Sequence, residues 1–274
     1  MRILLVSNMY PSPERPEFGV FVRNLERALV ARGNEVVPVV LDDPAHGRLH
    51  TPAKYAQLAA RTVAAARRVK PDVVYAHYLV PTGLIAAATR RPFVVTAHGG
   101  DVANAERGGP LATATRAVIA RAAAVICVSE YLAERLPSTP RRLEVIDCGV
   151  DTTAWRPARR APGDGPRFLY VGSLTERKNV GRLLDAFRGL GEGTLRIVGA
   201  GPLEGALRAI APPGVEFLGR VPHQQLLAEL AGCDVLCQPS LVEPQGQALL
   251  EALACARPVV ATRVGGPPEF VTPD

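Results

Sequence analysis

Two glutamates eight positions apart carry the clearest chemical signal in the sequence. Glu243 lies in PSLVEPQG, a segment of turn residues, and Glu251 lies in QALLEALAC, whose pattern predicts a helix. A carboxylate among leucines and alanines is costly unless it has a partner. The first backbone N–H groups of this helix, those of Gln247, Ala248 and Leu249, form an anion site. The segment predicts a site for a phosphorylated, polyhydroxylated ligand. The alternative is a solvated Glu251 and an ordinary turn glutamate.

A pair of cations, Arg177 and Lys178, precedes a predicted helix over residues 180–189. Cations beside a helix N-terminus oppose its dipole, but a bound diphosphate would reverse this effect. The pair could also be solvated and without function. However, Lys178 is one of only three lysines among 32 basic residues. Together with the glutamate segment, it favours a diphosphate ligand.

Other candidate residues follow predicted strands in the first half of the chain. His98 and Asp101 lie in AHGGD, directly after the strand predicted for residues 93–96. This histidine could bond a sugar hydroxyl or a reacting oxygen, or it could brace the loop. His77 also ends a strand, but its neighbours predict packing. Gly19 opens the first helix, either to admit a ligand to the backbone or as a plain helix-start glycine.

The elements that position these residues are predicted by a repeated alternation of strand and helix patterns. It predicts an α/β protein with two tandem Rossmann-like domains, each a doubly wound parallel sheet, facing a cleft. Residues 1–150 form the first domain. Residues 151–166, rich in Pro, Gly and Arg, form a linker, and residues 167–274 form the second domain. The predicted helices cover 20–32, 53–69, 110–122, 130–136, 180–189, 202–210, 223–231 and 247–255.

Composition excludes several classes of function. The 274 residues carry a net charge of +6, but the arginines are dispersed and aromatic residues make up 5%, so we expect no nucleic-acid binding. The five cysteines form no CxxC pair and lie near no histidine at ligand spacing, which predicts no metal site. No apolar run approaches the roughly 20 residues of a membrane span, and no signal peptide is evident. We expect a cytoplasmic protein.

The predicted helix near residues 53–70 carries an apolar stripe through Tyr55, Leu58, Val63 and Ala66. Such a helix could touch the inner face of an anionic membrane. A plain amphipathic helix packed on the sheet is the alternative that we favour.

The motifs FGxFV, HGGD, VGxLxxRKN, IVGxGP, FLGRV, EPQGQALLEALAC and PVVATxVGG follow one another from the first to the last residue. In this order the sequence resembles the retaining family 4 glycosyltransferases of the GT-B fold, with their EX7E motif. The resemblance implies transfer of a sugar from a nucleoside-diphosphate sugar to a glycan, lipid-linked or small-molecule acceptor. It also implies retained anomeric configuration and no metal or other cofactor.

The same resemblance implies catalytic roles for four residues. Glu243 would hold hydroxyls of the transferred sugar, and Lys178 with Arg177 would neutralise the leaving diphosphate. His98 would lie beside the donor sugar on the acceptor side.

It also implies contacts with the donor nucleotide. Glu251 would bond the ribose hydroxyls, and Val221 would lie against the base. The amides of Gln247, Ala248 and Leu249 would contact phosphate and sugar, and Gly19 would let the diphosphate approach the first domain.

Two departures from the family pattern leave alternatives open. Ser173 stands where many relatives have an arginine, which removes one diphosphate cation. The chain ends at VGGPPEFVTPD, where relatives continue, so we expect either a fragment or a protein without the element that braces the two domains. The second sheet should then expose an apolar surface, and domain closure should be weaker. The alternative functions are an impaired nucleotide-sugar-binding remnant and a GT-B-type nucleotide-sugar epimerase, which would need further acid/base carboxylates.

Overall fold

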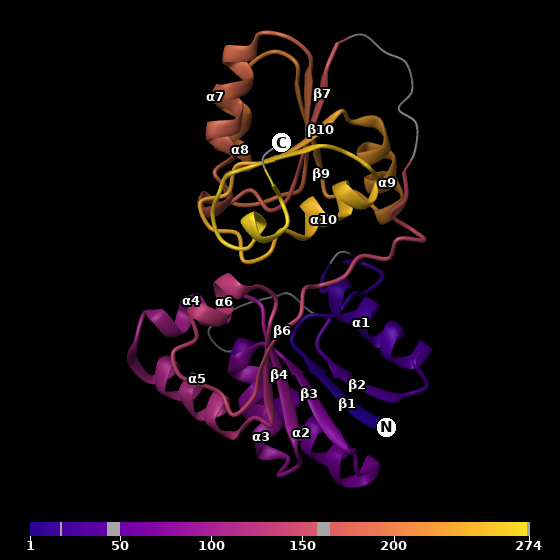
Figure 1. Ribbon diagram of the computed structural model, residues 1–274, viewed down its shortest axis with the longest axis vertical. Helices are drawn as coiled ribbons and strands as arrows, with labels where there is room; N and C mark the ends of the chain where they lie inside the picture. Colours follow the sequence, from indigo (N-terminus) through magenta and orange to yellow (C-terminus); the bar gives the residue numbers. More distant parts are fainter. Residues whose placement is uncertain (17, 43–49, 158–164, 273–274) are drawn as a thin grey trace. The chain divides into compact units, whose positions relative to one another are not determined.

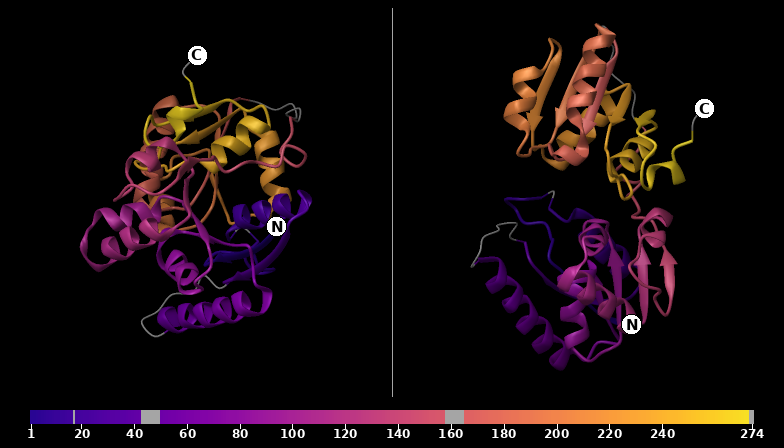
Figure 2. Two further views of the ribbon diagram at one scale, coloured as in Figure 1. Left: turned by 60° about the horizontal axis from the view of Figure 1, so that its bottom comes forward. Right: turned by 90° about the vertical axis from the view of Figure 1, so that its left-hand side faces the viewer.

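The computed structural model describes residues 1–16, 18–42, 50–157 and 165–272. Within them the chain forms two compact units, Met1–Asp147 and Cys148–Asp274. Each unit is built on one parallel β-sheet with helices packed against it (Figures 1 and 2). This is the predicted doubly wound α/β architecture, repeated twice along the chain.

The first unit contains a six-stranded sheet of order β2-β1-β3-β4-β5-β6, and every pairing is parallel. Its apolar strands are buried because helices cover the sheet. The chain leaves β1 for β2 on one side and later returns to β3 on the other, so the winding reverses between β1 and β3. The strands are β1 (Arg2–Ser7), β2 (Glu35–Val40), β3 (Val73–His77), β4 (Phe93–Ala97), β5 (Ala124–Cys127) and β6 (Leu143–Val145).

Helices pack on the first sheet as right-handed crossovers require, with α1 on one face and α2, α3 and α5 on the other (Figure 1). The apolar stripe of α2 turns inward, because Leu58 and Ala66 are buried. The described residues include no helix long and apolar enough to span a membrane. The helices and turns are α1 (Val20–Ala31), α2 (His50–Val69), η1 (Leu79–Gly83), α3 (Leu84–Ala88), α4 (Gly100–Glu106), α5 (Gly109–Arg121) and α6 (Glu130–Glu134).

Two short helices of this unit, α3 and α4, are absent from the sequence prediction. α4 begins within the glycine pair Gly99–Gly100, which predicts a loop when only local preference is considered. The Asp101 carboxylate bonds backbone N–H groups at its start, so the helix depends on a buried side chain rather than on propensity.

The second unit contains a five-stranded parallel sheet of order β11-β10-β7-β8-β9, whose winding reverses between β7 and β10. α7 and α8 lie on one face, and α9 and α10 lie on the other (Figure 1). The elements are β7 (Arg167–Val171), η2 (Glu176–Lys178), α7 (Val180–Leu190), β8 (Thr194–Val198), α8 (Glu204–Ile210), β9 (Val215–Gly219), α9 (His223–Gly232), β10 (Val235–Gln238), α10 (Gln247–Ala254), β11 (Val259–Ala261) and η3 (Pro267–Glu269).

Part of the segment predicted as a linker packs onto the second unit. Trp155 is 3% exposed and lies in a core cluster with Leu169, Leu230 and Leu249. Its backbone N–H bonds the Asp151 carbonyl at 2.8 Å, which closes a turn. The described part of this segment is therefore held by apolar burial against the sheet.

One face of the second sheet is open beside α7. Val260 of β11 is 62% exposed and Leu190 of α7 is 49% exposed. Between them lies a cavity of about 410 Å³ whose apolar lining includes Leu183 and Phe187. Apolar side chains of β11 and α7 are thus exposed at this cavity.

Candidate functional site

Lys178 and Glu243 form a partly buried ion pair at the carboxyl edge of the second sheet. Lys178 ends the 3₁₀ turn η2 that follows β7, and Glu243 lies on the loop between β10 and α10. Lys178 Nζ lies 2.5 Å from Glu243 Oε2. A backbone bond of 2.8 Å from the N–H of Leu241 to the carbonyl of Arg177 joins the same two segments. Since β7 and β10 flank the point where the winding reverses, the pair lies where open α/β sheets bind ligands.

The Glu243 carboxylate is fixed by two further side chains. Gln238 Nε2 donates to Oε2 at 2.7 Å, and Ser240 Oγ donates to the same oxygen at 3.1 Å. All three residues are buried, with Glu243 itself 6% exposed. A charge removed from water in this way requires such partners. Our sequence prediction missed Gln238 and Ser240, although polar residues at the end of a buried strand were the signal that led to His98.

Gly265 and Gly266 support the backbone of Glu243 from the loop after β11. Gly266 N–H donates to the Glu243 carbonyl at 3.0 Å. Gly265 has φ of 70°, and a Cβ atom built on it would lie 1.9 Å from the same carbonyl oxygen. Only glycine fits this approach. The VGG motif found in the sequence therefore has a physical role next to the carboxylate.

Glu251 lies inside α10 and is 9% exposed. Burial raises the pKa of its carboxyl from the ordinary 4.5 to about 7, while a hydrogen bond from the side chain of Gln247 acts in the opposite direction. The alternative of a solvated Glu251 on the helix surface is therefore wrong.

The structure corrects one predicted contact at the start of α10. The backbone N–H of Leu249 donates to the Gly246 carbonyl at 2.9 Å, so it is not available to an anion. Gly246, with φ of 95°, adopts the left-handed conformation, and its carbonyl accepts the first bonds of the helix. The amides of Gln247 and Ala248 precede this bond and remain candidates for phosphate contact.

Two glutamines join this loop to the first residues of the second unit. Gln245 Nε2 donates to the Cys148 carbonyl at 3.3 Å, and Gln247 Nε2 donates to the Gly149 carbonyl at 3.5 Å. The loop that carries Glu243 is thereby tied to the chain segment that enters the unit.

The remaining predicted residues of the second unit occupy different surroundings. Arg177 is exposed beside Lys178, and Ser173 is exposed on the loop after β7, where its carbonyl accepts the Tyr170 hydroxyl at 3.0 Å. Val221 follows β9 and packs against the core that contains Trp155. The structure thus brings Lys178 next to Glu243, leaves the Arg177 side chain exposed and gives Val221 a packing contact.

Gly19 begins α1 in the first unit with φ of 75°. A Cβ atom at this position would lie 2.6 Å from the backbone carbon of Met9. The close approach of the Met9 backbone is thus enough to require glycine at position 19, without any ligand. Approach of a ligand to this position stays a prediction.

Asp101 holds His98 at the carboxyl edge of the first sheet. Asp101 Oδ1 accepts the N–H groups of His98, Gly99 and Val102 at 3.2, 2.9 and 3.1 Å, and Oδ2 accepts that of Leu79 at 2.9 Å. Burial raises the pKa of this carboxyl, although the four bonds act to lower it. One buried carboxylate thus joins the segments that follow β3 and β4.

His98 also contacts the second histidine of this edge. His77 Nδ1 lies 3.0 Å from His98 Nε2, so His77 makes a hydrogen bond beyond the packing predicted from the sequence. Burial lowers the pKa of His77 to about 3, and burial together with His77 lowers that of His98 well below its ordinary value. Both rings are therefore neutral near pH 7.

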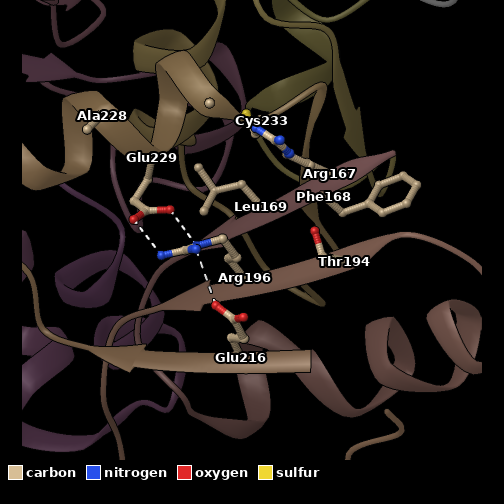
Figure 3. A pocket seen from close by; sticks show the side chains of 10 residues that line it. Arg167, Phe168, Leu169, Thr194, Arg196, Glu216, Ala228, Glu229 and Cys233 are labelled. Atoms are coloured by element: carbon tan, nitrogen blue, oxygen red, sulfur yellow. Dashed lines mark hydrogen bonds and ion pairs between the residues drawn. The ribbon is translucent and has the colours of Figure 1, made fainter. Parts of the chain in front are cut away.

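The cavity shown in Figure 3 lies at the opposite, amino edge of the second sheet. It measures about 390 Å³ and contains Arg196, which pairs with Glu229 at 2.7 Å and with Glu216 at 3.2 Å. None of the predicted site residues lines it. We assign it no role in the chemistry of Lys178 and Glu243.

The cysteines have the buried surroundings predicted for apolar residues. None of the five cysteines, all of which the structure describes, forms a disulfide, and four of them are buried. Burial raises the pKa of Cys233 and of Cys237 to about 11, which opposes metal binding by thiolates. Among the described residues, no three His, Cys, Asp or Glu side chains gather as metal ligands would.

In comparison with known proteins, both units match models of glycosyltransferase families. A family model described as Glycosyltransferase Family 4 matches residues 18–154, half of the chain. A second model, Glycosyl transferases group 1, matches residues 165–274. An uncharacterized glycosyltransferase of Methanocaldococcus jannaschii is 28% identical over 73% of this chain. The chain spans 58% of the length of that relative.

Two solved structures share the fold at lower identity. Sucrose-phosphate synthase from Thermosynechococcus elongatus superposes with a TM-score of 0.80 at 22% identity, covering 100% of this chain and 84% of that one. Anabaena HepE in complex with UDP-glucose gives a TM-score of 0.77 at 21% identity, covering 100% and 83%. The chain, with its two parallel-sheet units in tandem, has the GT-B fold and belongs to glycosyltransferase family 4.

Proposed function

We propose that this protein transfers a sugar from a nucleoside-diphosphate sugar to an acceptor, with retained anomeric configuration and without a metal ion. The observation that carries the proposal is the partly buried Lys178–Glu243 pair at the switch point of the second sheet, where Glu243 lies on the loop that leads to Glu251. The complex of the structurally similar HepE with UDP-glucose supports a nucleotide sugar as the donor.

Glu251 would bind the ribose of the donor. Its carboxyl is shielded from water inside α10, and its raised pKa reports that the charged form lacks solvation. Two neighbouring hydroxyls of a ribose can donate to the two carboxylate oxygens and replace the missing water. Base contact at Val221 belongs to the same proposal.

Lys178 and Arg177 would stabilise the departing diphosphate. Negative charge grows on the leaving oxygen as the glycosidic bond breaks, and two cations placed in advance lower the cost of that charge. The amides of Gln247 and Ala248 would add hydrogen bonds from a helix N-terminus. This arrangement supplies positive charge from the chain itself, so the proposal needs no metal.

Glu243 would hold the transferred sugar. The bonds from Lys178, Gln238 and Ser240 all converge on Oε2, so Oε1 is the oxygen that we assign to sugar hydroxyls. No residue is assigned as a nucleophile. The acceptor oxygen would attack the anomeric carbon from the face that the diphosphate leaves, and its hydroxyl proton would pass to the departing diphosphate oxygen. Positioning and charge neutralisation would supply most of the acceleration.

The first unit would supply the acceptor side, with His98 next to the reacting oxygens. The acceptor class stays open among glycans, lipid-linked sugars and small molecules. Because the apolar stripe of α2 packs inward, we include no membrane contact of this helix in the proposal. Asp101 is occupied by four backbone N–H groups, which leaves it unsuited to the acid/base chemistry of an epimerase.

A donor screen tests the proposal. Purified protein is mixed with a panel of nucleotide sugars and candidate acceptors, and nucleoside-diphosphate release and the anomeric configuration of the product are measured. We expect release with one donor class and a product of retained configuration. An inverted product would overturn retention.

Two other results would replace the proposal. Thermal stabilisation by a donor without release would identify an impaired binding remnant, for which exposed Ser173 in place of an arginine is the structural argument. Formation of an isomeric nucleotide sugar would identify an epimerase.

A further inference from the structure

The two histidines of the first unit form a dyad at the ends of neighbouring strands. His77 is the last residue of β3, and His98 directly follows β4, which pairs with β3 in parallel. Their rings lie 5.3 Å apart between centroids with an interplanar angle of 21°, and the Nδ1···Nε2 distance is 3.0 Å. His77 is 2% exposed, so this contact is closed to water.

Aromatic side chains fix both rings. Phe21 and Tyr78 each lie 4.8 Å from the His98 ring, and Tyr75 stacks on His77 at 4.9 Å. Asp101 fixes the backbone of both strand ends, as described above. These contacts hold the two rings in one orientation. The ring nitrogens that carry protons must therefore suit that orientation.

The burial of the outer His77 nitrogen decides where those protons lie. Two neutral rings share one proton between Nδ1 of His77 and Nε2 of His98. Among the described residues, His77 Nε2 is buried and has no hydrogen-bond partner. An unpaired buried N–H is rarer and costlier than an unpaired acceptor, so His77 carries its proton on Nδ1 and donates it to His98. His98 Nε2 then accepts, and the proton of His98 lies on Nδ1.

We propose that His77 is a positioning residue that sets the tautomer of His98, so that His98 presents an Nδ1–H donor to an oxygen of the substrates. The role in turnover rests on the proposed function. In this tautomer His98 cannot accept the proton of the acceptor hydroxyl, because Nδ1 is already protonated and Nε2 is occupied. It instead donates a hydrogen bond to a sugar or leaving oxygen.

Imidazole ¹⁵N NMR tests the tautomer without any need for activity. The His98 signals are assigned by their loss in His98→Gln. We expect a protonated Nδ1 and an unprotonated Nε2 in the wild-type protein at pH 7. A protonated Nε2 would overturn the proposal, and this measurement requires no variant at His77.

Variants at His77 then separate positioning from packing. His77→Phe keeps the aromatic stack but removes the donor, and we expect the Nδ1–H tautomer of His98 to lose its preference. His77→Asn returns an N–H near the Nδ1 position and should restore it. Tyr75→Phe is the control, since it changes a neighbour of the same ring without removing the bond. Retention of the wild-type tautomer in His77→Phe would refute the role of His77.

The kinetic readout links the dyad to transfer. In His77→Phe we expect kcat to fall about tenfold or more, as for other partners that orient a functional histidine, with the donor KM nearly unchanged and with recovery in His77→Asn. If the wild-type protein transfers sugar and His77→Phe keeps the wild-type kcat, the positioning role of His77 is refuted while the proposed function stands. If the wild-type protein transfers no sugar yet shows the expected tautomer shift, the proposed function fails while the dyad stands.

Discussion

Lys178 Nζ lies 2.5 Å from Glu243 Oε2, and the two residues follow the adjacent strands β7 and β10. One ion pair thus joins the group assigned to the leaving diphosphate and the group assigned to the sugar. Because Glu243 is buried and is further bonded by Gln238 and Ser240, the separation of the two groups is set before a donor binds. Such preorganisation is what stabilisation of a developing charge requires.

Lys178→Met should reduce donor turnover by about 10²- to 10³-fold, since one preorganised donor is lost and Glu243 is left without its cation. Initial rates of nucleoside-diphosphate release measure this effect. Lys70→Met, at an exposed lysine after α2, is the matched control and should keep wild-type turnover. Near-normal turnover in Lys178→Met would show that the site assignment is wrong.

Glu251 should make the stability of the protein depend on pH. Its pKa is raised from 4.5 to about 7 by burial, so the folded state binds more protons than the unfolded state between these values. The contribution of Glu251 is therefore most favourable below pH 4.5 and declines as the pH rises to 7, by roughly 3 kcal/mol at most.

Urea unfolding of the wild-type protein and Glu251→Gln at pH 5, 6, 7 and 8 measures this dependence. The difference between the two proteins isolates Glu251 from the buried histidines, whose lowered pKa values act in the opposite direction below pH 6.5. A difference that stays constant from pH 5 to 8 would contradict the raised pKa.

Gly265→Ala should destabilise the second unit and displace Glu243. The added Cβ would meet the Glu243 carbonyl oxygen at 1.9 Å, and φ of 70° disfavours alanine. We expect a loss of about 1–3 kcal/mol in unfolding free energy, together with reduced turnover at temperatures where the variant is folded. Gly232→Ala is the control, because no atom lies within 4 Å of its Cβ position. If Gly265→Ala and Gly232→Ala have the same unfolding free energy and the same turnover, Gly265 has no role in positioning Glu243.

Ser173→Arg should strengthen donor binding by adding a cation to the exposed loop after β7. The donor KM is the quantity to compare. Ser173→Ala should leave it unchanged, since Tyr170 bonds the backbone carbonyl of Ser173 rather than its side chain. A KM that rises in Ser173→Arg would place the diphosphate away from this loop.

Chelation should not change donor turnover, because Arg177 and Lys178 take the place of a divalent cation in the proposed mechanism. Initial rates are compared with and without EDTA. Inhibition by EDTA that is reversed by Mg²⁺ would show that the two cations are insufficient.

Local periodicity was enough to predict most of the fold. The pattern of Leu184 and Phe187 predicts a helix over 180–189, and α7 covers Val180–Leu190 because these side chains enter the core. α4 could not be predicted in this way, since its start depends on the distant partners of Asp101. Helices that a buried carboxylate stabilises have no strong local signal.

The site was predictable only in part for a similar reason. Lys178 and Glu243 carry charge and lie at recognisable positions, and the structure pairs them. Gln238 and Ser240 acquire their role only when β10 brings them to the carboxylate. The lost availability of the Leu249 amide follows from one backbone conformation at Gly246. The dyad of His77 and His98 likewise arises from strand pairing, which sequence spacing does not report.

The bonds from Gln245 and Gln247 to the carbonyls of Cys148 and Gly149 have a mechanical consequence. The boundary between the two units falls at Asp147 and Cys148, so the chain that joins them is attached to the Glu243 loop at its very first residues. A shift of Cys148 or Gly149 is therefore transmitted to the loop of Glu243 through two side-chain amides.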